Sequence, residues 1–147
     1  MPSMIERTLT HARFLAKHLE SHDLQCASIA VLVDLGLASH RDGFAYLIKG
    51  TTTFTSNPLR RTTKELYALI AENVDPGMDE KKIEQAIRSV ITEAWKNRDE
   101  SVWRIYFPAG RNGVLKKPSN AVFIAQIGYF LILWQGCCRK EASCERE

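Results

Sequence analysis

The side chains of residues 79–98, DEKKIEQAIRSVITEAWKNR, divide between two faces of a predicted helix. One face is apolar and repeats at helical spacing through Ile83, Ala86, Ile87, Val90, Ile91, Ala94 and Trp95. The far face is polar and consists of Gln85, Arg88, Ser89 and Thr92, with Lys81 and Lys96 near them. Side chains of these types on a rigid helix can read base edges in the major groove of DNA. A solvated helix face without any partner has the same pattern, so both interpretations stand.

A cationic segment follows this helix. Between Val102 and Asn120 there is no carboxylate, and there are four cations, namely Arg104, Arg111, Lys116 and Lys117. A cationic loop beside a mixed-charge helix fits a division of labour in which the loop holds phosphates and the helix reads bases. A positively charged loop with no partner is the alternative. The net charge of +3 and the pI of about 8.7 permit nucleic-acid binding without requiring it.

Helical spacing of apolar residues recurs along the chain and predicts an all-α fold, a compact helical bundle. Gly36 is expected to end one of the helices. Pro76 and Gly77 form a turn between two others, and Asp79 can cap the helix that follows. Helix, short turn and long helix is the order of a helix-turn-helix motif. The expected helices span 3–21, 25–36, 41–55, 62–73, 79–98, 99–106 and 119–134.

Smaller features complete this expectation. Thr62 or Thr63 can cap the helix that begins there. Strand signals are weak, although residues 103–107 and 113–115 could pair briefly. Residues 136–147 are polar, and we expect them to form a mobile tail.

Other residues that could carry chemistry have simpler interpretations. His11, His18 and His22 share one predicted helix face, and the last two have the i, i+4 spacing of some metal sites. Zinc sites need three or four converging ligands, so a surface or partly packed histidine cluster is favoured, with no metal and no cofactor. Free thiols are likewise favoured over a metal site for the C-terminal cysteines, which are Cys137, Cys138 and Cys144.

The chain shows no motif for catalysis or export. It contains no GxSxG, P-loop or GxGxxG sequence, so we expect no enzyme. No secretory signal opens it, which favours a reduced cytoplasmic setting for the cysteines. The longest apolar run, residues 121–134, is too short to span a bilayer and is interpreted as a buried helix rather than a membrane anchor.

Four segments occur in a characteristic order. They are SIAVLVDLGLASHRDGFAYLIKG, the pair Leu66-Tyr67, the helix IEQAIRSVITEAW and the segment KPSNAVFIA. Together they resemble the C-terminal DNA-binding effector domain of the sporulation response regulator, the stage-zero sporulation transcription factor family. The resemblance implies an all-helical domain whose helix-turn-helix reads a short DNA box, usually as tandem boxes bound by more than one copy. It also implies three parts, which are an N-terminal helical extension at 1–24, the DNA-binding domain at 25–135 and the tail at 136–147.

The resemblance places five side chains of the 79–98 helix toward DNA, namely Lys82, Glu84, Gln85, Arg88 and Ser89. Glu84 and Arg88 match the residue types of the family. Gln85 stands where the family has an arginine, Ser89 where it has a histidine, and Lys82 replaces an arginine. An arginine fork pairs best with guanine, whereas glutamine pairs best with adenine. We therefore expect that this chain does not simply reuse the family's box.

The expected function is a sequence-specific transcription regulator that binds double-stranded DNA. Lys116, Lys117 and Arg111 are expected to hold phosphates. RNA polymerase and a second copy of the chain on tandem sites are further expected partners. The alternative is a protein-interaction module that pairs with or antagonises a full-length regulator without binding DNA itself.

The residues before the resemblance are too few for the family's receiver domain, which suggests a lone effector domain. Its activity would then depend on abundance, self-association or a partner. The predicted helix at 3–21 could contact that partner or could pack on its own domain, which is the usual use of such a helix.

Overall fold

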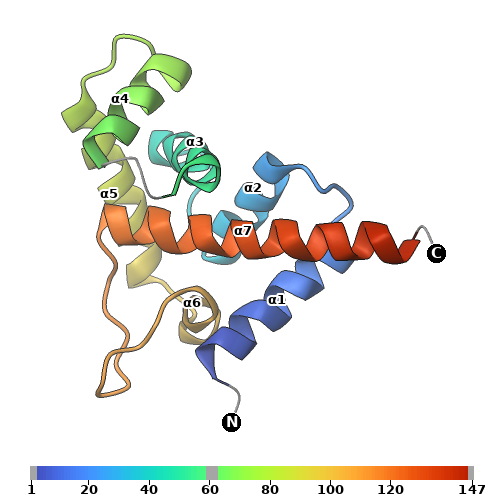
Figure 1. Ribbon diagram of the computed structural model, residues 1–147. Coiled ribbons are helices and arrows are strands. Elements are labelled where there is room, and N and C mark those ends of the chain that lie inside the picture. The colour runs from blue at the N-terminus through green and yellow to red at the C-terminus, as the bar shows by residue number, and fades with distance from the viewer. Residues whose placement is uncertain (1–2, 59–62, 146–147) are drawn as a thin grey trace.

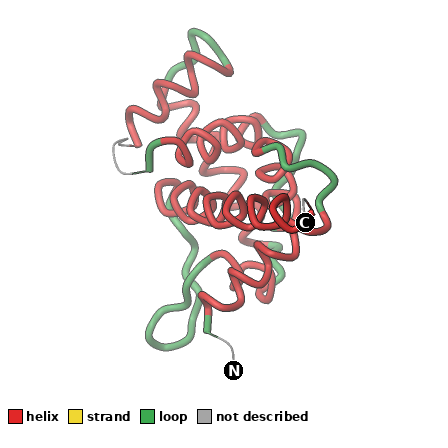
Figure 2. Tube along the Cα trace, turned by 45° about the vertical axis from the view of Figure 1, so that its right-hand side comes forward, coloured by secondary structure: helices red, strands yellow, loops and turns green. Residues whose placement is uncertain are grey.

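The computed structural model describes residues 3–58 and 63–145, and these residues form seven helices (Figure 1). They are α1 (Met4–His18), α2 (Leu24–Asp34), α3 (Asp42–Ser56), α4 (Thr63–Val74), α5 (Glu80–Lys96), α6 (Glu100–Tyr106) and α7 (Asn120–Glu145). The described ranges contain no strand, and the predicted all-α class is confirmed (Figure 2). The expected pairing of 103–107 with 113–115 is wrong. Most of the first segment is helical, and the loop closes on itself through a 3.0 Å bond from the Gly110 amide to the Val114 carbonyl.

The central element is α7, which contacts α1, α2, α3, α5 and α6. Figure 1 shows it crossing the whole molecule, with α1 on one side and α3 on the other. Its buried side chains are mostly large and include Phe123, Ile127, Phe130, Leu131 and Trp134. The short α6 adds two buried aromatic residues, and the Tyr106 ring meets the Phe130 ring edge-on with 4.9 Å between centroids. Burial of this much apolar surface is the main source of stability for a domain of this size.

The predicted mobile tail at 136–147 is wrong for the residues that the structure describes, because α7 continues through them to Glu145. Cys137 and Cys138 are buried free thiols rather than tail residues. The second half of α7 has a partner that local sequence does not reveal, since α1 packs along it. The boundary expected at 136 therefore falls inside a helix. The side chain of Cys144 lies outside the described part of the chain.

The length of α7 also corrects the argument made from the 14-residue apolar run. Asn120–Ala142 is long and apolar enough to cross a membrane by length and composition. Half of that window is buried inside the domain, as in the core helix of a globular protein. Packing, rather than a shortage of length, distinguishes α7 from a membrane span.

The N-terminal helix α1 packs on its own domain, as expected from its amphipathic pattern. Ala12 and Ala16 are buried, and their small side chains let α1 approach α7 closely. The Thr8 hydroxyl donates a 2.6 Å hydrogen bond to the Ile105 carbonyl of α6. The structure therefore joins the first helix to two elements from the last third of the chain.

The predicted helix-turn-helix is formed by α4 and α5. Gly77 in the intervening turn has φ +87°, a conformation that glycine adopts without steric cost. The Asp79 carboxylate caps α5 by accepting a 2.9 Å bond from a backbone amide of the first turn, as predicted. Gly36 likewise follows the end of α2 with φ +88°. The expected cap at Thr62 or Thr63 lies outside what the structure describes.

Helix α3 packs against both helices of the helix-turn-helix and holds them in place. The Tyr46 hydroxyl donates a 2.8 Å bond to Asp75 in the turn. Burial and this hydrogen bond raise the pKa of Tyr46 to about 12. At Gly43 the backbones of α3 and α5 nearly touch, since a Cβ there would lie 2.3 Å from the Ala86 carbonyl oxygen. The position of α5 therefore depends on the absence of a side chain at the start of α3.

Gly43→Ala should lower the free energy of unfolding by about 1–3 kcal/mol, because α3 and α5 must separate to admit the methyl group. Urea unfolding followed by circular dichroism measures this change. Gly136→Ala in α7 is the matched control, since its Cβ would lie 3.8 Å from the Arg139 guanidinium and alanine favours a helix. Equal stability of Gly43→Ala and the wild type would show that the two helices are not in close contact.

Candidate nucleic-acid interface

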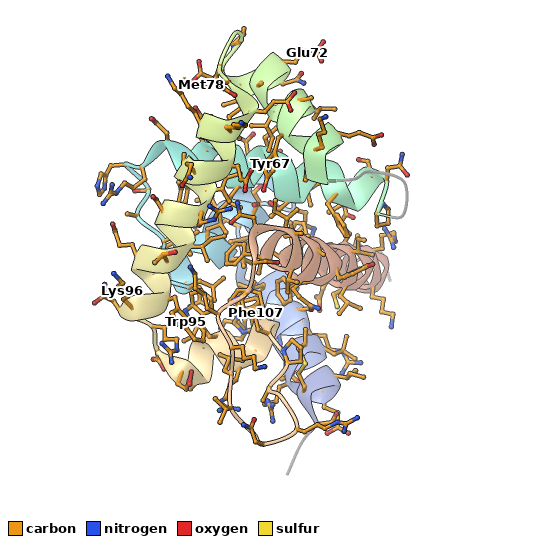
Figure 3. All side chains as sticks on the ribbon, turned by 90° about the vertical axis from the view of Figure 1, so that its left-hand side faces the viewer. Tyr67, Glu72, Met78, Trp95, Lys96 and Phe107 are labelled. Carbon is orange, nitrogen blue, oxygen red and sulfur yellow. The ribbon has the colours of Figure 1, made fainter. Side chains whose placement is uncertain are left out.

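The two faces predicted for α5 are present in the structure. The buried face consists of Ile83, Ile87, Val90, Ile91 and Ala94. The exposed polar positions are Lys81, Lys82, Gln85, Arg88, Ser89 and Lys96, and Glu84 is half-buried beside them. Figure 3 shows Lys96 pointing away from the molecule while the neighbouring Trp95 lies against its body. The Trp95 ring meets the buried Trp103 edge-on at 5.5 Å, which fixes the rotation of α5 at this end.

A hollow of about 380 Å³ lies beside the first half of α5. Glu84 and Arg88 of α5 form one side of it, Tyr67 of α4 another, and Lys117 and the start of α7 the third. The Arg88 guanidinium donates a 2.5 Å hydrogen bond to the Glu84 carboxylate, and both side chains remain accessible to solvent. The structure therefore brings Lys117, from the cationic segment, next to two of the predicted reading residues.

Asn120 joins the three elements of this hollow. Its side-chain amide donates a 3.1 Å bond to the Tyr67 hydroxyl and a 3.0 Å bond to the Glu84 carbonyl. Burial raises the pKa of Tyr67, so its hydroxyl stays neutral at physiological pH. Pro118 is buried just before this residue, and the Ser119 hydroxyl accepts a 3.2 Å bond from the Val122 amide in the first turn of α7. The backbone that carries Lys117 is thus anchored beside α5 by the residues that follow it.

A second hollow, of about 400 Å³, runs along the other side of α5. Its lining includes three of the predicted base-reading residues, Gln85, Arg88 and Ser89. Thr92 and Lys96 line it farther along the helix. Arg41, at the start of α3, also lines it and forms an ion pair with Glu93. Sequence reasoning missed Arg41, because only the tertiary packing of α3 against α5 brings the two helices together. The only local signal was its position next to a predicted helix start.

The remaining predicted cations differ in placement. Lys116 is exposed next to Lys117. Arg111 is exposed in the loop between α6 and α7, and it lines neither hollow beside α5. Figure 1 shows this loop running away past α6 before it returns to the start of α7. Arg104 donates a 2.8 Å bond to the Gly113 carbonyl, so this cation serves the loop itself.

The histidines of α1 do not lie at this interface. His11 is packed among Tyr106 and Phe130, and burial is the main cause that lowers its pKa. His22 lies after α1, with its Nε2 2.9 Å from the Ala16 carbonyl. The described part of the chain contains no group of three His, Cys, Asp or Glu side chains that could hold a metal ion.

An all-helical domain with a helix-turn-helix, an exposed polar second helix and a lysine beside it has the architecture of the helical DNA-binding domains. The model of one family, described as "Sporulation initiation factor Spo0A C terminal", matches residues 29–130. The chain belongs to this family, whose domain is the DNA-binding part of a sporulation transcription factor and not an enzyme. The match runs from the second half of α2 to the first part of α7 and includes both hollows beside α5. It leaves α1 and the end of α7 outside.

Asn120→Ala should lower the free energy of unfolding by about 1–3 kcal/mol, because the buried Tyr67 oxygen loses its donor. Chemical unfolding of the two proteins measures the difference. Asn73→Ala is the matched control, since the exposed Asn73 amide bonds only to a carbonyl of its own helix, Leu69. A change no larger than that of the control would mean that Asn120 does not join α7 to the motif.

Proposed function

We propose that this chain is a sequence-specific transcription regulator that inserts α5 into the major groove of double-stranded DNA. The observation that carries the proposal is the position of α5 beside two hollows, each lined by one cation from another part of the chain, Lys117 in the first and Arg41 in the second. A groove-bound helix must meet bases along its exposed face and phosphates on both flanks. Membership of a DNA-binding family supports the same conclusion.

The proposed base-reading residues are those carried over from the family resemblance, namely Lys82, Glu84, Gln85, Arg88 and Ser89. In the free protein Glu84 holds the Arg88 guanidinium by an ion pair along the helix. This contact can orient the arginine fork before it meets guanine, and a glutamate can itself accept from cytosine. Gln85 favours adenine where the family's arginine would favour guanine. The preferred DNA sequence should therefore differ from the family's box.

The proposed phosphate contacts lie on either side of α5. Lys117 and Lys116 serve one flank, beside the start of α7. Arg41 and Lys96 serve the other, along the second hollow. Arg111 can reach only DNA that extends beyond the part covered by α5, because its loop points away from that helix (Figure 1). Two copies on tandem sites and contact with RNA polymerase are part of the same proposal.

Arg88→Ala and Lys117→Ala should have different effects on DNA binding. Loss of Arg88 should cost about 1–3 kcal/mol at one base position and relax specificity there. Loss of Lys117 should weaken all sequences alike and reduce the salt slope by about one phosphate contact. A random-sequence selection with the wild type supplies the site, and mobility-shift titrations at several salt concentrations measure both effects. Specific binding that survives Arg88→Ala unchanged would rule out α5 as the reading helix.

Arg41 provides a second test on the opposite flank. Arg41→Ala should weaken binding to all duplexes and lower the salt slope, because one phosphate contact is lost. Glu93→Gln should instead strengthen binding, because it releases Arg41 from its ion pair and removes a negative charge from the groove. Glu72→Gln on α4 is a control for removal of a carboxylate outside both hollows. Unchanged binding by both Arg41 and Glu93 variants would place the phosphate contacts on the Lys117 side alone.

One observation favours the interaction-module alternative. Two arginines at the candidate interface are already paired with carboxylates, Arg88 with Glu84 and Arg41 with Glu93. A surface neutralised in this way also suits a protein partner. A module of that kind would show neither sequence preference nor a steep salt slope in the titrations above.

A further inference from the structure

The exposed side of α1 carries a prominent aromatic residue, Phe14, whose side chain remains 54% exposed. Its ring is positioned by two neighbours on the same helix. The His11 ring stacks near it at 6.2 Å and the His18 ring lies 4.5 Å away on the other side. Because these contacts already restrict the ring, a partner that covers it would lose little side-chain entropy on binding.

Phe14 separates two hollows, and both are also lined by Thr10. The first, of about 500 Å³, lies between α1 and α6. Its walls are largely apolar, with Phe14 on one side and Ile105 on the other. His11 and Arg7 also line it. A hollow of this shape accepts an apolar side chain from outside.

The second hollow, of about 310 Å³, lies between α1 and the last turns of α7. Three cations line it, namely Arg13, Lys17 and Lys140, and all three are exposed. None of these cations forms an ion pair with a described residue. Glu141 is the one carboxylate in the lining. The side chains that line this second hollow therefore have a net positive charge.

We propose that this surface, formed by Phe14, its two hollows and the three cations, binds an acidic amphipathic helix of a partner protein. An apolar side chain of that helix would enter the α1–α6 hollow and cover Phe14. Its carboxylates, one or two turns away, would meet Arg13, Lys17 and Lys140. An aromatic anchor beside a complementary charged rim is the usual composition of a binding hot spot.

The chemistry of the surface separates this partner from other anions. A nucleic-acid backbone would satisfy the cations but offers little apolar surface to cover Phe14. A membrane surface prefers a continuous apolar ridge, whereas here the ring stands between two hollows. The surface also lies away from the proposed reading helix, since α1 packs on α6 and α7 and lies on the opposite side of α6 from α5 in Figure 1. The inference is therefore independent of the proposed function, and both partners could bind together.

The test is a peptide-display selection against the full chain. The library presents helical peptides with aspartate or glutamate on one face and randomised apolar residues on the other. Selected peptides are labelled and titrated by fluorescence anisotropy. Phe14→Ser should weaken their binding by about tenfold. The double variant Arg13→Glu/Lys17→Glu should weaken it further, and charge-reversed peptides with lysine in place of the acids should not bind to the wild type.

The matched control is Tyr129→Ser, which removes another exposed aromatic side chain, on α7, and should leave peptide binding unchanged. Retained helicity and thermal unfolding show that each variant is folded. A selection that yields no binder dependent on Phe14 would overturn the proposal. So would Phe14-dependent binding to vesicles of phosphatidylglycerol and phosphatidylcholine, or loss of duplex DNA binding in the charge-reversed variant, since each would assign the surface to another partner.

Discussion

Burial of the apolar side of α7 is the interaction on which the rest of the structure depends. Five of the other helices pack on α7, and α4 packs on α3 and α5 and meets α7 through the hydrogen bond between Asn120 and Tyr67. The buried aromatic residues Phe123, Phe130 and Trp134 are spread over three turns of this helix. They hold α6 at one level and α1 at another, and the first residue of α7 fastens α4 and α5 through hydrogen bonds. A change in the packing of α7 would therefore move the candidate interface even though few of its residues would face DNA.

Local signals in the sequence predicted most helices because those helices have complete local patterns. The stripe on α5, the turn at Gly77 and the cap at Asp79 are all contained within about twenty residues, and each was found in the expected place. The second half of α7 could not be predicted in this way. Its covering helix is α1, more than a hundred positions earlier, so polar residues after Trp134 were interpreted as a tail. Local pattern carries no information about such a partner.

The candidate site shows the same division between local and distant information. Side chains of one helix, such as Gln85 and Arg88, were assigned together because helix periodicity places them together. Lys117 lies beside α5, as expected for the cationic segment. Arg111 belongs to the same segment but does not lie beside α5, because the loop turns away from that helix before it returns to the start of α7. Arg41 was missed since its place beside α5 depends on the close approach at Gly43. Charge composition alone cannot distinguish these three cations.

The contact between α1 and α7 also has a consequence for the order in which the chain folds. It joins the first helix to the last, so it has the greatest sequence separation of any helix pair in the described structure. During synthesis α1 leaves the ribosome long before α7 and must wait for it. Until then the apolar partners of α7 have nothing to cover them, and contacts of such long range slow the final step of folding. Nascent chains of this protein should therefore depend on chaperones until α7 has left the ribosome.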